Sequence, residues 1–301
     1  MPQIDVGAPF GALVDWLTAN FGPLFHFISA VMLYLLDAVL YVLTAPHPFI
    51  VTAVFVALAL LERKWGFGLL TLIAFLLIQA MGLWVEAMQT LALVVVATVF
   101  AVAIGIPVGI WAARSRRVSN VVRPVLDFMQ TLPVFVYLIP AVFFFGIGAV
   151  PGVVATIVFA IPPATRLTEL GIRSVDKEVT EAATAFGSKP RQMLREVQLP
   201  LAMPSIMAGV NQTLMLALSM VVIAGLVGAG GLGAVVVRGI STLDVGAGFE
   251  GGIAVVFLAI YLDRLTQALA KPRRRHAKTG KQTTETAPTD QPADQGAPVS
   301  S

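Results

Sequence analysis

Charged side chains gather in one stretch of this chain, residues 166–200, which lies between two apolar runs. Within this stretch, Glu181 offers a carboxylate to a basic partner, and Arg191 and Arg195 offer guanidinium groups to an acidic one. The chemistry that these residues could do is therefore the ionic docking of another protein. A solvated loop that binds nothing is the plain alternative.

Catalytic and metal-binding constellations are not visible in the sequence. Cys is absent, and His26, His47 and His276 are too dispersed to predict a metal site or a catalytic triad. No G-x-x-x-x-G-K-[ST] motif occurs, so we do not expect this chain to hydrolyse ATP itself. Residues 228–233 fit G-x-G-x-x-G, but they follow an apolar helix rather than a strand, which predicts a close-packed outer loop instead of a nucleotide site.

Residue order predicts a helix–turn–helix within the charged stretch. Asp176 can cap a first helix over about residues 177–186, and Gly187 supplies its C-terminal stop. Ser188 can cap a second helix, which should end before Pro200. Small side chains lie on the first helix, where they would permit close approach to another surface: Ala182, Ala183 and Ala185.

Composition assigns the chain to the membrane. Of its 301 residues, 57% are hydrophobic and only 12% are charged, whereas about 25% charged residues is usual in soluble domains. A membrane-spanning helix takes about 20 apolar residues, so the fold class is all-α and polytopic. We expect seven transmembrane helices, from the apolar runs 46–61, 67–83, 86–113, 124–147, 151–164, 203–227 and 249–269.

Basic residues give these helices an orientation. Placing residues 62–65, 114–123, 166–200 and the C-terminus in the cytoplasm leaves only Arg238 outside, in agreement with the retention of positive charge on that side. The N-terminus is then outside and the C-terminus is cytoplasmic. Because the basic residues are scattered at helix ends and form no continuous face, no nucleic-acid partner is expected.

Two terminal segments complete the expected domain organisation. Residues 1–45 form an extracytoplasmic segment. Within 24–44, apolar residues recur at helical spacing on one face, and less hydrophobic residues form a stripe on the opposite face. That pattern predicts a helix lying in the membrane interface, although an eighth span is the alternative because the length allows it. Residues 46–84 would supply two peripheral spans and 85–270 the core. Residues 271–301 have little apolar content and predict a disordered cytoplasmic tail.

Polar side chains recur on single faces of two predicted spans. Ser205, Gln212 and Ser219 are spaced by seven residues, and Gln130 and Tyr137 are spaced likewise on an earlier helix. Such side chains either hydrogen-bond between helices or line a transport pathway. The candidates for the pathway are Gln130, Tyr137, Gln212 and Ser219.

Other features of the spans and outer loops have two interpretations each. Arg238, Asp244 and Glu250 lie on the outer side, where they could contact a receptor or hold an outer gate, or could be solvated loop charges. Residues 105–109 form a GxxxG motif, which favours close helix packing. Pro107 within that helix predicts a kink.

The charged stretch resembles a signature of a known transporter family. Glu-Ala-Ala at 181–183, then three residues, Gly187, nine residues and Val-Gln-Leu-Pro at 197–200 closely resemble the "EAA" signature of the membrane subunits of binding-protein-dependent ABC importers. In that family the loop forms a coupling helix that sits in a groove of the ATPase subunit. The resemblance therefore implies an ATPase-coupling role for four residues: Glu181, Ala182, Ala183 and Gly187.

The resemblance extends over about residues 85–270. Over this range the chain is similar to the permeases of glycine betaine and proline uptake. This resemblance implies a type I ABC importer permease core in the bacterial inner membrane, a homodimer, a separate cytoplasmic ABC ATPase that holds ATP and Mg²⁺, and an extracytoplasmic substrate-binding protein. No cofactor is expected in this chain, and the chain is not expected to be an enzyme. The implied cargo is a quaternary ammonium or proline-type osmolyte such as glycine betaine.

Two rival functions make different demands on the sequence. A secondary transporter or osmotically gated channel would need intramembrane coupling carboxylates and often inverted repeats. An integral-membrane enzyme would need catalytic residues clustered at one depth. The chain has few such carboxylates, and neither a repeat nor a catalytic cluster is visible.

Overall fold

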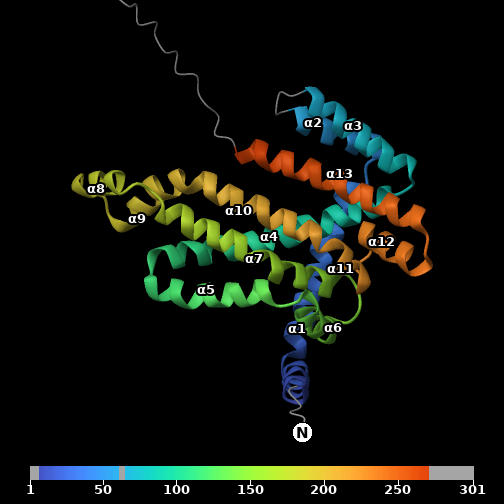
Figure 1. The fold of residues 1–301 in the computed structure, drawn as a ribbon, viewed down its shortest axis with the longest axis horizontal. Helices are drawn as coiled ribbons and strands as arrows, with labels where there is room; N and C mark the ends of the chain where they lie inside the picture. The colour runs from blue at the N-terminus through green and yellow to red at the C-terminus, as the bar shows by residue number, and fades with distance from the viewer. Residues whose placement is uncertain (1–6, 61–64, 271–301) are drawn as a thin grey trace, which may run out of the picture. The chain divides into compact units, whose positions relative to one another are not determined.

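A computed structural model describes residues 7–60 and 65–270, and every regular element in these ranges is a helix (Figure 1). The predicted tail, 271–301, and the charged residues 62–64 lie outside the described residues. The helices are α1 (Gly7–Thr44), α2 (Pro48–Leu60), α3 (Trp65–Ala80), α4 (Trp84–Arg114), α5 (Arg116–Thr131), α6 (Val134–Phe145), α7 (Ala149–Arg173), α8 (Lys177–Ala185), α9 (Pro190–Gln192), the π-helix η1 (Met193–Gln198), α10 (Leu199–Ser219), α11 (Val221–Leu226), α12 (Gly231–Thr242) and α13 (Val245–Ala270).

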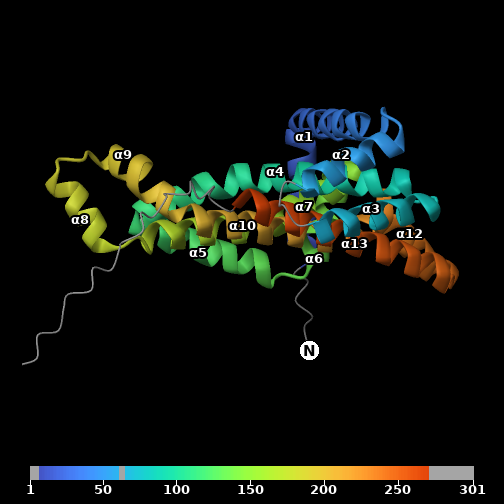
Figure 2. The ribbon, with the colours of Figure 1, turned by 90° about the horizontal axis from the view of Figure 1, so that it is seen from above.

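Helices α4, α7 and α10 lie side by side and form the centre of the bundle (Figures 1 and 2). Small residues permit this close packing. A Cβ atom added to Gly109 of α4 would lie 2.6 Å from the carbonyl oxygen of Thr165 and 2.7 Å from Cβ of Thr168 on α7. The GxxxG motif is therefore a helix-packing motif, as predicted.

Peripheral helices α2 and α3 attach to the core through α13. Tyr261 of α13 packs its ring 5.3 Å from that of Phe55 and 5.4 Å from that of Phe75, measured between ring centroids. All three side chains are buried. This aromatic cluster therefore joins α2 and α3 to α13.

The number of long spans differs from the prediction, although the architecture is all-α and polytopic as expected. Five described segments are long and apolar enough to cross a membrane: α1, α4, α7, residues 190–226, and α13 up to residue 268. Helices α2 and α3 have 13 and 16 residues, fewer than the ~20 that a straight crossing requires.

Residues 124–147 were expected to form one span, and the structure divides this region between two helices. Helices α5 and α6 occupy this region and meet at an angle of 92°. Leu132 between them is extended, with φ −65° and ψ 133°, because a residue before proline is disfavoured in the helical region. Pro133 therefore bends the chain here, and the pair counts as a sixth span only if both arms are taken together.

Helix α1 runs across α4, α7 and α10 and not along them (Figure 1). Its Met32 and Leu36 are buried in the cluster that α1 shares with α4 and α7. The stripe of milder residues is exposed: His26, Ala30, Tyr34, Asp37 and Tyr41. By length and composition α1 also qualifies as a span. The interfacial position of α1 stays a prediction.

Candidate coupling site and transport pathway

The first helix of the charged stretch begins and ends at the residues predicted for it. The Asp176 carboxylate accepts a hydrogen bond from the Glu178 N–H at 2.9 Å, which caps the N-terminus of α8. At the other end, Gly187 has a left-handed φ of +81°. The N–H of Gly187 donates to the Thr184 carbonyl, and the N–H of Ser188 donates to the Ala183 carbonyl. This pair of bonds is a Schellman motif, in which glycine is preferred.

The second helix of the predicted helix–turn–helix has a different N-cap residue from the one predicted. Lys189, and not Ser188, precedes α9, and its N–H donates to the Gln192 side chain at 3.0 Å. Ser188 belongs to the turn that closes α8 and lies one position before the N-cap of α9. The helical structure also does not end before Pro200. It continues through η1 directly into α10, and Pro200 lies in the first turn of α10.

Helix α8 buries none of its side chains against the rest of the chain. Glu181, Ala182 and Gly187 are exposed, and Ala183 is half-buried. Phe186 directly follows the helix and is 92% exposed. A nine-residue helix without buried contacts is marginal alone in water, so this surface is suited to burial by another protein. Sequence reasoning used Phe186 only as a helix end; an aromatic residue within a polar stretch was the available signal.

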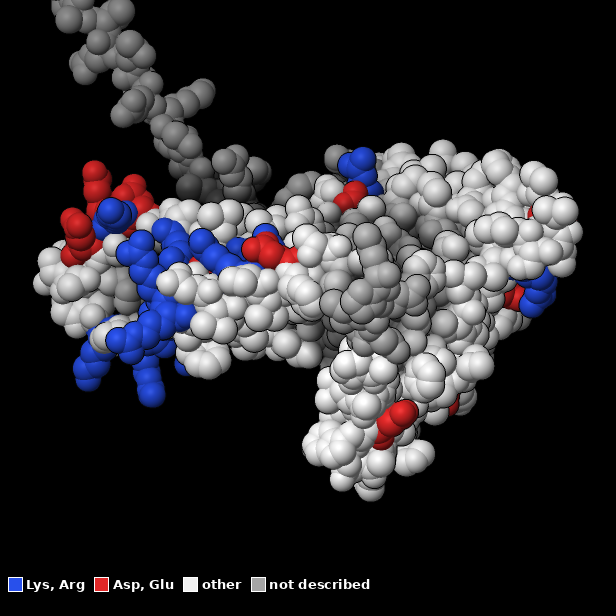
Figure 3. Space-filling model, turned by 60° about the horizontal axis from the view of Figure 1, so that its bottom comes forward, with Lys and Arg blue, Asp and Glu red and all other residues white. Residues whose placement is uncertain are grey.

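Positive charge concentrates at the end of the bundle that carries α8. Figure 3 shows Lys and Arg gathered there, with Asp and Glu beside them. The exposed basic residues of this region include Arg114, Arg116, Arg117, Lys189, Arg191 and Arg195. The acidic and basic groups around α8 form an exposed surface of mixed charge, and the docking roles of Glu181, Arg191 and Arg195 stay a prediction.

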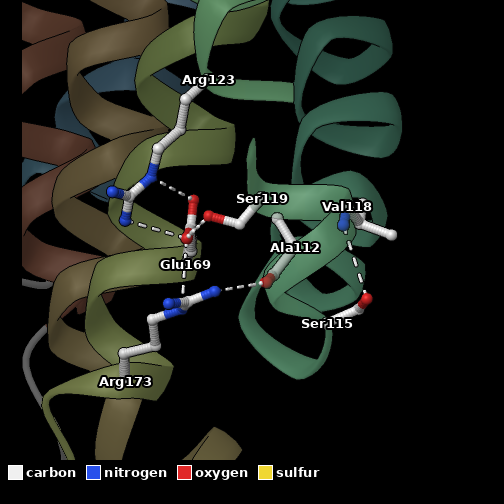
Figure 4. A network of polar contacts seen from close by, with 7 residues as sticks. All are labelled: Ala112, Ser115, Val118, Ser119, Arg123, Glu169 and Arg173. Atoms are coloured by element: carbon white, nitrogen blue, oxygen red, sulfur yellow. Dashed lines mark hydrogen bonds and ion pairs between the residues drawn. The ribbon is translucent and has the colours of Figure 1, made fainter. Parts of the chain in front are cut away.

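Close to this end, a buried carboxylate joins three helices (Figure 4). Glu169 of α7 accepts hydrogen bonds from Ser119 at 2.7 Å and from Arg123 at 3.0 Å, both on α5. Arg173 of α7 lies 3.2 Å from the same carboxylate and donates to the carbonyl of Ala112 on α4 at 2.8 Å. Only 3% of the Glu169 side chain is exposed. Sequence reasoning missed this cluster because its members are far apart along the chain.

The four pathway candidates lie on three helices, α5, α6 and α10. Gln212 and Ser219 lie on the exposed face of α10, and Gln130 lies on the exposed face of α5. Tyr137 packs against the cluster around Leu138 on α6, and its buried hydroxyl has no partner within the described residues. Helices α5, α6 and α10 each pack on α7, and three of the four side chains, Gln130, Gln212 and Ser219, are exposed.

The outer candidates divide between a structural role and open surface. Arg238, Asp244 and Glu250 are all exposed. They lie on α12, in the turn after it and on α13, and α12 lies at the end of the bundle opposite α8 (Figure 2). Asp244 accepts a hydrogen bond from the N–H of Ala247 at 3.1 Å and so caps the first turn of α13. None of the three forms an ion pair with any residue of 7–60 or 65–270.

The glycine-rich motif forms a close-packed turn, as predicted, but it leads into a helix that was not expected. The N–H of Gly231 donates to the side chain of Gln89 at 2.9 Å, and that of Leu232 donates to the Thr90 hydroxyl at 2.8 Å. Gly230 and Gly231 have φ of +75° and +68°. Two side chains of α4 therefore cap the N-terminus of α12, which replaces the long loop expected after residue 228.

Comparison with known proteins gives consistent matches over most of the chain. The family described as "Binding-protein-dependent transport system inner membrane component" matches residues 105–275. The glycine betaine/proline betaine transport system permease protein ProW of Escherichia coli (strain K12) is 52% identical over 261 residues, which cover 87% of this chain and 74% of the relative. The glycine betaine transport system permease protein OpuAB of Bacillus subtilis (strain 168) is 47% identical, with 89% and 95% covered.

A solved structure supports the fold. An inward-facing structure of the MetNI methionine ABC transporter aligns with a TM-score of 0.57 and 24% identity. The alignment covers 62% of this chain and 94% of that chain. At this identity the similarity shows a shared fold.

Proposed function

Because the chain belongs to the family of binding-protein-dependent transport system inner membrane components, we propose that it is the permease of an ATP-driven importer for glycine betaine or a related compatible solute. The relatives named for glycine betaine transport align over nearly nine tenths of the chain. The structural observation that carries the proposal is α8, a capped helix that bears the family signature and has no buried side chain.

Docking of a cytoplasmic ATPase explains the exposure of α8. Glu181, Ala182, Ala183 and Gly187 would lie in a groove of that partner, and Phe186 would fill an apolar pocket beside them. The capped ends of α8 keep it rigid, so a movement of the partner is passed on as a displacement of the whole helix. ATP and Mg²⁺ belong to the ATPase, and this chain supplies no catalytic group.

A second copy of the chain would complete the pathway. Two permeases that face each other would enclose Gln130, Tyr137, Gln212 and Ser219 between their open faces. An extracytoplasmic substrate-binding protein would deliver the solute at the end that carries Arg238 and Glu250, with Asp244 holding the turn between them. We infer from the basic residues at the α8 end that this end lies in the cytoplasm, with the N-terminus outside.

The remaining segments support this core. Residues 85–270 would form the transporting unit, α2 and α3 would be peripheral helices, and α1 would lie in the outer membrane interface of the bacterial inner membrane. ATP binding would draw two α8 helices together and open the outer face, and hydrolysis would restore the inward-facing state. This cycle is alternating access by rigid-body movement.

Reconstitution tests the function directly. Proteoliposomes that contain the chain, its ATPase and its binding protein should take up labelled glycine betaine only when ATP is supplied. Omission of any one protein should abolish uptake. Uptake by the chain alone would instead establish the secondary transporter or channel and overturn the proposal.

Charge reversal tests the docking helix. Glu181→Lys should lower co-purification of the ATPase at least tenfold, because it places a like charge against a basic partner. Glu178→Lys makes the same change on the same helix but outside the signature, and should have a clearly smaller effect. Membrane insertion of both variants should be normal. Equal co-purification of the wild-type protein and Glu181→Lys would contradict the assignment of α8.

A further inference from the structure

Helix α5 is attached to the bundle mainly by polar contacts. It buries only two side chains, Ser119 and Leu126. One of these, Ser119, donates its hydroxyl to Glu169 at 2.7 Å. One turn further on, Arg123 donates to the same carboxylate at 3.0 Å. A helix with so little apolar burial depends on these bonds for its position.

The other side of the carboxylate is equally well connected. Arg173 pairs with Glu169 at 3.2 Å and donates to the backbone of α4 at 2.8 Å. A single buried group thus fastens α5, α7 and α4 together (Figure 4). A second ion pair, Arg166–Asp127, links α5 and α7 nearby, but 61% of the Asp127 side chain is exposed. Water screens that pair, whereas loss of the Glu169 charge leaves two guanidinium groups without their anion.

The position of this cluster connects two parts of the proposed mechanism. Glu169 lies seven residues before Asp176, the cap of α8, on the helix that leads into α8. Helix α5 carries Gln130 on its exposed face and continues into α6. A displacement of α8 therefore reaches α7 close to the point where α7 holds α5.

We propose that Glu169 is a positioning residue that couples α8 to the pathway helix α5. Its buried carboxylate binds Ser119 and Arg123, so that α5 follows α7 when an ATPase moves α8. The inference rests on the proposed function. It assigns the transmission step to a residue outside the family signature and outside the pathway face.

The chain contains no Cys, which makes single spin labels simple to place. Asn120→Cys puts one label on the exposed side of α5 in each copy, and double electron–electron resonance in proteoliposomes reports the distance between copies. In the labelled protein that retains Glu169, this distance should differ between the nucleotide-free and the ATP–vanadate-trapped complex. Glu169→Gln should abolish the shift and lower glycine betaine uptake per ATP hydrolysed at least tenfold, while ATPase co-purification stays within about twofold.

Further variants separate coupling from stability. Arg123→Gln removes the partner that is mostly exposed, with 59% of its side chain accessible, and should give the same defect to a smaller degree. Glu169→Asp retains the charge and should restore part of the shift. Glu86→Gln, which removes one carboxylate from α4, should behave as the wild-type protein does. If Glu169→Gln fails to assemble, Arg123→Gln decides the question.

The outcomes distinguish the two proposals. Absence of ATP-driven uptake in the labelled wild-type background would refute the proposed function. A different result would refute the role of Glu169 alone. In that case the labelled background transports normally, and Glu169→Gln or Arg123→Gln keeps both the full distance shift and the full uptake per ATP hydrolysed.

Discussion

At the scale of single residues, Gly187 shows how one backbone conformation supports the docking surface. Its φ of +81° lies in the left-handed region, which costs about 1–2 kcal/mol for residues with a Cβ atom. A Cβ atom added there would contact nothing within 4 Å. The constraint is therefore conformational and not steric, and it concerns the turn that holds α8 relative to α9.

Substitutions of Gly187 test this distinction. Gly187→Ala should weaken binding of the partner ATPase about fivefold, which corresponds to about 1 kcal/mol. Gly187→Asn should have a smaller effect because Asn adopts the left-handed region more readily. Titration of the ATPase against the permease in detergent measures both. Equal affinities for the Ala and Asn variants would contradict the conformational explanation.

At the scale of helices, the contact between α4 and α7 depends on residues without side chains. Gly105 and Gly109 bring the backbone of α4 against α7, and a Cβ atom on Gly105 would lie 2.8 Å from Cβ of Ala164. Glu169 lies on the same helix α7, one turn beyond this contact. Close packing therefore places α4 and α7 at the separation that allows Arg173 to reach the carbonyl of Ala112.

Enlargement of Gly109 should separate these helices. Gly109→Ala places a Cβ atom 2.6 Å from a backbone carbonyl, and overpacking of this kind costs about 1–3 kcal/mol. The midpoint of thermal unfolding in detergent should fall by several degrees. Gly252→Ala is the matched control, because a Cβ atom on Gly252 meets nothing within 4 Å and alanine favours a helix. A midpoint that is equally unchanged in both variants would refute the packing argument.

At the scale of the whole molecule, one chain leaves a polar face of α10 exposed. Gln212 and Ser219 are exposed on this helix, whereas Ser205 packs against Gly171 of α7. Of the three positions predicted to share one face, Ser205 therefore packs against another helix near the α8 end, whereas Gln212 and Ser219 lie on open surface. Open polar surface within the membrane suits a pathway between two copies.

Thiol labelling distinguishes a pathway from a lipid-facing surface. In this Cys-free chain, Gln212→Cys should react with a water-soluble, membrane-impermeant maleimide in the assembled transporter, because the pathway contains water. Leu69→Cys on α3 is the control, because 59% of the native side chain is exposed. This thiol should stay unlabelled because lipid covers it. Protection of both thiols would contradict a pathway along α10.

Sequence alone determined the features that depend on neighbouring residues. Asp176 and Gly187 delimit α8 because capping and left-handed turns are local interactions within a few residues. The GxxxG spacing predicted a packing face for the same reason, since residues four apart share one side of a helix. Composition determined the membrane class, and the residues of the signature indicated the family.

Only the tertiary structure decided which distant groups meet. Ser119 and Glu169 are 50 residues apart, and Gln89 and Gly231 are 142 apart, so no periodicity within either segment could pair them. The course of α1 across the bundle was likewise visible only in the tertiary structure. The physical reason is that long-range contacts depend on the relative positions of whole helices, whereas caps and turns depend on the chain's own next few residues.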